Sequence, residues 1–188
     1  MEYKGLPVFV VDINDASIFN NVSLVDDPAV RETFIKLSKQ EELKFSVNDE
    51  KRIVSGPALI PDFPIYRDMD GEKFYLKFTE DTVKEYAIKF FRDKREGEGN
   101  IQHQFGVNGI TFFESYLLNK ERGIVPKEFE NLPDGTWFLS AKIDNDEVWQ
   151  LVKDGVLNGF SVDIQTSISP EKDELNSIDD LIKYFKKQ

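Results

Sequence analysis

The chain has a single histidine and no cysteine, and that histidine can be paired with a serine in a glycine-flanked segment. Ser161 lies within residues 159–163 (GFSVD), where a helical pattern gives way to a strand pattern. A serine hydroxyl is a poor nucleophile until a base removes its proton. An imidazole titrates near neutral pH and is the usual base. The sequence therefore makes Ser161 the candidate nucleophile and His103 the candidate general base.

A third side chain would be needed to orient the imidazole and stabilise its charged form. Glu114 is the preferred candidate, because it interrupts an apolar strand and shares one strand face with Phe112 and Tyr116. A carboxylate on a largely apolar face needs a partner. Asp163 is the second candidate, on the same strand face as Ser161.

Each of these residues also has a simpler interpretation. Ser161 fits a half-buried strand position, His103 a surface position and Glu114 an edge-strand glutamate. The segment around Ser161 is not a Gly-x-Ser-x-Gly nucleophile elbow, because Asp163 stands at the second glycine. Arg67 could bind a carboxylate or stabilise an oxyanion, although a structural ion pair or a turn is the simpler explanation.

Composition excludes several other classes of function. The 188 residues carry a formal net charge of −11, which argues against a nucleic-acid surface. No apolar run is long enough to span a bilayer, so we expect no membrane partner. Without cysteine there is no thiolate site, and the acidic pairs lack the register of a calcium loop. We predict no metal and no cofactor, and a hydrolase built on a pair of carboxylates has no motif to support it.

The elements that must position these residues are mainly strands. Period-two or apolar patterns predict strands over residues 8–11, 21–25, 43–47, 52–60, 73–78, 109–118, 135–143 and 159–168. An apolar stripe from Val83 to Phe91 predicts the longest helix, capped by Thr79 or Thr82, and Asn145 caps a short one. Strands that do not alternate regularly with helices predict an α+β fold with a mainly antiparallel core.

The chain is predicted to form one domain over residues 1–168. Residues 169–176 are a predicted linker, and residues 177–185 have the pattern of a short amphipathic helix. Residues 169–188 are thus expected to form a linker and a C-terminal helix outside the domain.

Short segments along nearly the whole chain resemble the XkdF-like phage serine proteases, a branch of the prohead (capsid maturation) proteases. They occur in the order found in that family, at residues 22–29 (VSLVDDPA), 54–62 (VSGPALIPD), 65–67 (IYR), 100–103 (NIQH), 113–116 (FESY), 135–137 (GTW), 144–149 (DNDEVW) and 159–161 (GFS).

The resemblance implies a β-barrel-like core with surrounding helices, similar to the herpesvirus assemblin proteases. It implies a serine endopeptidase that cuts scaffold and capsid proteins, and possibly itself, inside the procapsid in the host cytoplasm. A homodimer is implied by the fold family. Ser161 would be the nucleophile and His103 the base, while Glu114 rests on its own strand pattern. The competing interpretation is a non-catalytic capsid-assembly or scaffold-like protein with a protease-derived fold.

Overall fold

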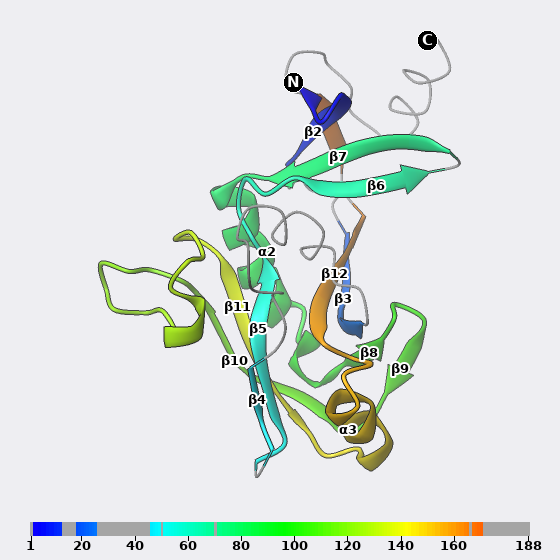
Figure 1. The fold of residues 1–188 in the computed structure, drawn as a ribbon, viewed down its shortest axis with the longest axis vertical. Helices are drawn as coiled ribbons and strands as arrows, with labels where there is room; N and C mark the ends of the chain where they lie inside the picture. The colour runs from blue at the N-terminus through cyan, green and yellow to red at the C-terminus, as the bar shows by residue number, and fades with distance from the viewer. Residues whose placement is uncertain are drawn as a thin grey trace.

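The computed structural model describes residues 2–12, 18–25, 46–49, 51–69, 71–165 and 167–170. These residues form three β-sheets, two α-helices and two short 3-10 helices (Figure 1). The predicted C-terminal helix and the polar segment at residues 29–42 lie outside the described residues. None of the described helices is long and apolar enough to cross a membrane.

The first sheet is fully antiparallel, with the strand order β10-β11-β5-β4. Its strands are β4 (Ser46–Asn48), β5 (Ile53–Leu59), β10 (Ile110–Leu117) and β11 (Trp137–Ile143). The strand β11 is one of the two inner strands and is buried along almost its whole length. Its rich content of aromatic and branched residues suits such a position.

The second sheet has the order β12-β3-β8-β9 and carries the predicted nucleophile, Ser161, and, in the turn between β8 and β9, the predicted base, His103. Its strands are β3 (Ile18–Val25), β8 (Gly99–Ile101), β9 (Phe105–Val107) and β12 (Gly159–Gln165). The pairing of β3 with β8 is parallel, and the other two pairings are antiparallel.

The third sheet covers one end of the molecule (Figure 1). It contains β1 (Glu2–Tyr3), β2 (Leu6–Asp12), β6 (Ile65–Met69), β7 (Glu72–Phe78) and β13 (Ser167–Pro170). The strand β13 pairs with β2, so this pairing runs two residues past the predicted domain boundary at residue 168.

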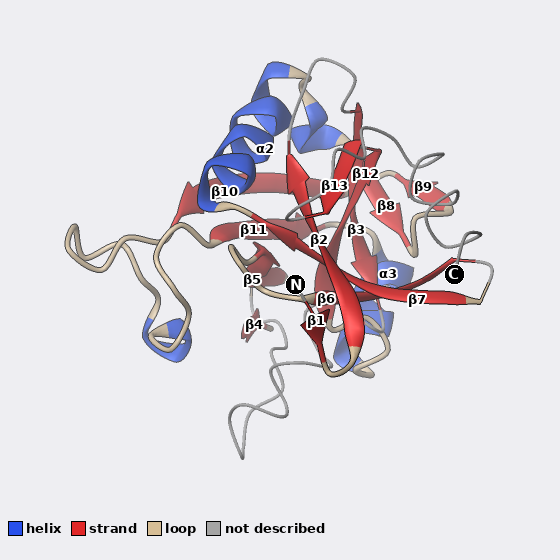
Figure 2. Cartoon of the chain, turned by 90° about the horizontal axis from the view of Figure 1, so that it is seen from above, coloured by secondary structure: helices blue, strands red, loops and turns tan. Residues whose placement is uncertain are grey.

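The two helices predicted within the domain, the long one after Thr79 or Thr82 and the short one after Asn145, are present. Helix α2 (Glu80–Arg92) begins after Thr79, whose side chain accepts a hydrogen bond from the Thr82 N–H, so Thr79 is the cap. Helix α3 (Asp146–Lys153) is capped by Asn145 as expected. Helix α2 lies along the first sheet (Figures 1 and 2). Its Phe90 ring contacts Phe112 and Trp137 edge-on, with centroids 5.5 Å away in each case.

The first and second sheets share one hydrophobic core. Phe112 of β10 packs against Phe160 of β12 with ring centroids 5.8 Å apart. The approach is closest at Gly99, where an added Cβ would lie 2.5 Å from the Cβ of Ile110. Because only a glycine leaves room for Ile110 here, β8 can lie directly on β10.

The α+β class and the mainly antiparallel pairing are confirmed. The predicted barrel-like core is not found. The described strands form separate sheets and no closed barrel. Two segments for which no helix or strand was predicted form regular elements. The stretch that includes Arg67 is the strand β6, and the polar residues before His103 form the 3-10 helix η1 (Arg95–Gly97) and the strand β8. A second 3-10 helix, η2 (Lys127–Phe129), lies in the loop before β11.

Candidate active site

Three neighbouring strands of the second sheet place polar side chains in one row. Ser161 of β12 is opposite Ser23 of β3, and Ser23 is opposite Asn100 of β8. Asp163 is opposite Asn21 in the next row on the same face. Alternate residues of a strand point to opposite faces. The intervening residues, such as Phe160, therefore enter the core, and this alternation produces a polar face on an otherwise apolar sheet.

His103 reaches this face from the turn between β8 and β9. The Gln104 N–H donates to the Ile101 carbonyl across the turn. Gln102 and His103 have φ values of 55° and 57°, as in a type I′ turn. Left-handed backbone costs a residue with a Cβ roughly 1–2 kcal/mol, and such strain concentrates at functional sites.

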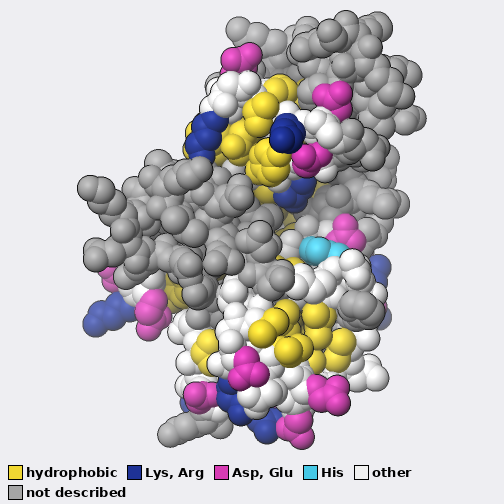
Figure 3. Space-filling view, turned by 45° about the vertical axis from the view of Figure 1, so that its right-hand side comes forward, with side chains coloured by type: hydrophobic (Ala, Val, Ile, Leu, Met, Phe, Trp, Pro, Cys, Tyr) yellow, Lys and Arg dark blue, Asp and Glu magenta, His cyan; other side chains and the backbone are white. Residues whose placement is uncertain are grey.

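Two hydrogen bonds to β3 hold this turn in place. The Gln102 N–H donates to the Leu24 carbonyl at 3.1 Å, and the His103 N–H donates to Ser23 Oγ at 3.2 Å. The imidazole is therefore positioned by backbone contacts as well as by its own side-chain contacts. Figure 3 shows it, as the only histidine of the chain, in the middle of one exposed face with an acidic side chain beside it.

The structure brings the predicted nucleophile and the predicted base into contact. The distance from His103 Nε2 to Ser161 Oγ is 2.9 Å. Ser161 is 9% exposed, while His103 is open to solvent on one side. A nucleophile and a base within hydrogen-bond reach are the geometric requirement for nucleophilic catalysis by serine.

The other imidazole nitrogen contacts a second serine. His103 Nδ1 lies 3.0 Å from Ser23 Oγ, and Ser23 is completely buried. The same hydroxyl lies 2.9 Å from Asn100 Oδ1 and 3.0 Å from Asn21 Oδ1. Ser23 thus lies between the imidazole and two carboxamides.

The contacts of Ser23 are compatible with the tautomer of His103 that suits a general base. A hydroxyl has one hydrogen and two lone pairs. With the Ser23 hydrogen directed to Asn21 or Asn100 and the His103 backbone N–H on one lone pair, the second lone pair can accept from an Nδ1–H. In that tautomer Nε2 accepts from the Ser161 hydroxyl, as a general base must.

Three influences act on the pKa of His103. Burial of part of the ring is the largest and lowers it, the negative charge of Asp163 raises it, and the positive charge of Arg67 lowers it. The pKa therefore lies below its usual value of about 6.5. The imidazole is ready to accept a proton at neutral pH.

Arg67 is a half-buried cation near this site. Burial lowers the pKa of its guanidinium, yet arginine remains charged in proteins. One of its N–H groups donates to the Tyr66 carbonyl at 2.9 Å. An arginine carries five N–H donors, so further donors are left for a bound group.

The structure does not bring Glu114 to His103. Glu114 is on β10 of the first sheet, where its carboxylate accepts a hydrogen bond from Ser140 at 2.5 Å. Ser140 also contacts Ser55 at 2.8 Å. Burial and the nearby Glu114 charge raise the pKa of Tyr116 to about 12. The Glu114 carboxylate was expected to need a partner, and that partner is Ser140. The residue beside His103 Nδ1 is Ser23.

Ser23, Asn21 and Asn100 were missed in the sequence, although a signal was present. Residues 21–25 (NVSLV) look like an apolar run, but their polar members fall on every second position. The same alternation occurs at residues 99–101 and 160–163. Among the described residues, no group of three side chains suited to holding a metal is found.

A mixed sheet that presents a serine–histidine pair, with the imidazole also in contact with Ser23, has the arrangement found in proteins that use a serine nucleophile. Comparison with known families agrees with this class. Residues 42–169 match the family described as "Putative phage serine protease XkdF", and the chain belongs to that family.

A curated relative points to the same family. The chain is 29% identical over 151 residues to the phage-like element PBSX protein XkdF of Bacillus subtilis (strain 168). The alignment covers 75% of this chain and 50% of the relative, so the chain spans about half the length of the relative it matches. Among solved structures there is no significant match.

Proposed function

We propose that this protein is a serine endopeptidase that cleaves proteins of an assembling phage capsid. The observation that carries the proposal is the 2.9 Å contact between Ser161 Oγ and His103 Nε2, with Nδ1 held by Ser23. Membership of the family described as phage serine proteases supports the reaction class.

In the proposed reaction, Ser161 Oγ attacks the carbonyl carbon of a peptide bond while Nε2 of His103 takes the hydroxyl proton. The tetrahedral intermediate collapses when the imidazolium gives that proton to the leaving amine, and an acyl-enzyme remains. Water then repeats the sequence, with His103 again as the base, and releases the acyl group as a carboxylate.

The imidazolium formed in each step is stabilised in two ways. Ser23 accepts the Nδ1–H bond and holds the ring, as a carboxylate does in the familiar triad. Because a hydroxyl is neutral, it supplies no charge. Asp163 supplies the negative charge, since it already raises the pKa of His103.

The oxyanion needs preorganised donors, which often supply the largest single contribution to catalysis. We assign this role to Arg67. Its positive charge lowers the pKa of His103, and its guanidinium has N–H donors besides the one that donates to the Tyr66 carbonyl. The further parts of the proposal come from the resemblance. They are an assemblin-like fold, capsid and scaffold proteins as substrates, a homodimer, and action in the procapsid within the host cytoplasm.

The test is intact-mass analysis over time. Wild type and Ser161→Ala are each incubated alone and with the capsid and scaffold proteins of the same phage. We expect wild type to cut at defined peptide bonds and the variant to lose at least about 10⁴-fold in rate. Equal cutting by both proteins would remove Ser161 from the mechanism. No cutting by either would favour the non-catalytic assembly protein.

A further inference from the structure

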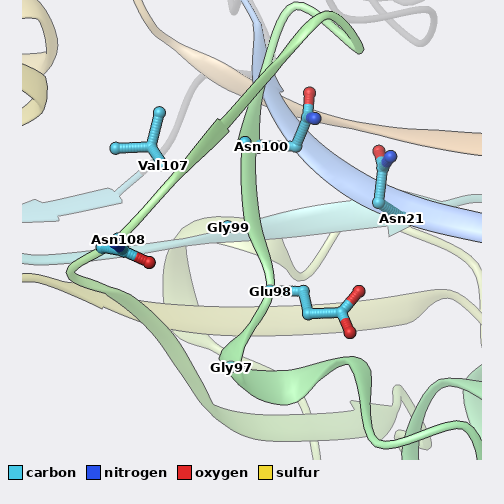
Figure 4. Close-up of a pocket in the computed structure, with 8 residues that line it drawn as sticks. Asn21, Gly97, Glu98, Gly99, Asn100, Val107 and Asn108 are labelled. Carbon is cyan, nitrogen blue, oxygen red and sulfur yellow. The ribbon is translucent and has the colours of Figure 1, made fainter.

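A cavity of about 280 Å³ opens beside the catalytic network. It lies over β3, β8 and β9, and its walls are polar or glycine, with one apolar side chain, Val107. Figure 4 shows Asn21, Glu98 and Asn100 on the same side of β8, away from Val107. At roughly 30 Å³ per water, the space suits one long side chain rather than a larger ligand.

The cavity is continuous with the catalytic row. Asn21 and Asn100 line it, and both also contact Ser23 Oγ. Asn100 is two strands away from Ser161, which is about 10 Å at the usual spacing of strands. An extended peptide advances about 3.3 Å per residue. A side chain within about three residues of the cleaved bond can therefore enter the cavity.

The wall chemistry favours a cation. Glu98 contributes a carboxylate, and the side-chain oxygens of the asparagines add neutral acceptors. Asp163 lies on the far side of Asn21 in the same row of the sheet. Arg95 forms an ion pair with Glu98 and balances part of this charge, but Arg95 does not line the cavity.

We propose that this cavity is a substrate subsite that takes the side chain of a lysine or an arginine near the cleaved bond. The inference rests on the proposed protease function, since it makes the occupant part of the substrate. The stem of the side chain would pass the backbone of Gly106, which pairs with Asn100, and its charged end would meet Glu98.

The test is an NMR titration of the full chain carrying Ser161→Ala, which keeps peptides intact. The probes are the acetylated amides of Gly-Lys-Gly and Gly-norleucine-Gly, whose central side chains differ in the charged end. We expect saturable shifts in the amide signals of residues 97–100 and 106–108 with the lysine peptide only. Equal shifts with both peptides, or none at these residues with either, would overturn the subsite.

Two charge variants separate recognition from a structural effect of the ion pair. Glu98→Gln and Arg95→Gln both break the pair of Arg95 with Glu98. If Glu98 binds the ligand, the first variant weakens lysine-peptide binding and the second strengthens it, each by about two- to fivefold for an exposed charge pair. Changes in the same direction in both variants would contradict recognition by Glu98.

Filling the cavity provides a test that does not depend on charge. Gly106 pairs with Asn100, so a side chain there would point to the cavity side of the sheet, and an added Cβ meets nothing within 4 Å. Gly106→Leu should abolish lysine-peptide binding without loss of folding, while Gly106→Ala keeps most of the space and most of the binding. Unchanged binding in Gly106→Leu would place the ligand elsewhere.

The outcome for the subsite is distinct from the outcome for the protease. Lysine-dependent binding with these variant effects supports the subsite even if wild type cuts no peptide. Serine-dependent cutting with no preference for basic side chains overturns the subsite and leaves the catalytic assignment intact.

Discussion

Ser23 occupies the position from which serine hydrolases usually orient their histidine with a carboxylate. Its hydroxyl accepts the backbone N–H of His103 and lies within hydrogen-bond distance of Nδ1. A neutral group can fix the tautomer but adds no charge to stabilise the imidazolium. In this account orientation and charge are therefore divided between Ser23 and Asp163.

Replacing Ser23 with alanine should remove the group that orients the His103 ring and leave the charge of Asp163 in place. Ser23→Ala leaves the ring free to turn, so we expect kcat to fall by about 10- to 100-fold, with KM little changed. The lost buried hydrogen bonds should also lower the free energy of unfolding by about 1–3 kcal/mol. Steady-state kinetics and urea unfolding measure both effects.

Ser140→Ala is the matched control for this change. Ser140 is an equally buried strand serine with hydrogen-bonded partners, but it lies in the first sheet. The Ser140→Ala variant should have a lower free energy of unfolding and an unchanged kcat. If Ser23→Ala also kept its kcat, Ser23 would be a structural residue only.

The pKa of His103 can be measured directly, because its ring gives the only histidine signals in the NMR spectrum. The Asp163 charge raises this pKa and the Arg67 charge lowers it. We expect Asp163→Asn to move the titration to lower pH and Arg67→Met to move it to higher pH. Because catalysis needs neutral His103, the acidic limb of the pH–rate profile should move in the same direction in each variant.

If the His103 pKa moved in the same direction in both variants, changes in the burial of the imidazole would outweigh the loss of the Asp163 or Arg67 charge. Glu114→Gln serves as the control. Glu114 hydrogen-bonds with Ser140 in the other sheet, so its removal should leave the His103 titration where it is in wild type.

At the scale of elements, the turn between β8 and β9 holds backbone strain at His103. Gln102 shares the left-handed conformation but does not contact the Ser161 hydroxyl. Gln102→Gly should remove its share of the strain and raise the free energy of unfolding by up to about 1 kcal/mol. Urea unfolding measures the change.

Gln104→Gly is the control in the same turn. Gln104 has no positive φ, so a glycine there only loosens the unfolded chain and should destabilise the protein by about 0.5–1 kcal/mol. Equal losses in the two variants would contradict the strained turn.

The close approach of β8 to β10 gives a second prediction for an element. In Gly99→Ala the new methyl would overlap Ile110, so β8 must move, and we expect a loss of about 1–3 kcal/mol in stability. The activity should also fall, because Asn100 and His103 follow Gly99 in the chain. Gly97→Ala, whose Cβ meets nothing within 4 Å, should show neither effect.

The elements that the sequence predicted best are those with a strong local pattern. The stripe of α2, the cap at Asn145 and the apolar strand β11 depend on neighbours a few residues away, and all three are confirmed. The strand β8 was missed because it is only three residues long and ends a polar, glycine-rich stretch, so its alternation is too short to predict a strand.

At the scale of the whole molecule, the site depends on pairings that no local pattern contains. Ser161 and His103 were predicted from residue type, and the structure brings them together across 58 positions of sequence. Ser23 joins them from 80 positions before His103. The register of β12, β3 and β8 aligns these residues, and Phe160 of β12 packs against Phe112 of the first sheet. Glu114 was chosen on local pattern alone and lies in the other sheet.

The central claim is that His103 activates Ser161, and covalent labelling with a fluorophosphonate tests it without any substrate. In the labelling step Ser161 Oγ forms a bond to phosphorus, fluoride leaves, and His103 takes the proton. We predict one label per wild-type chain, mapped to Ser161 by peptide mass analysis. His103→Ala should label at least about 100-fold more slowly, and Ser140→Ala at the wild-type rate. A label on another residue, or equal rates in wild type and His103→Ala, would contradict the claim.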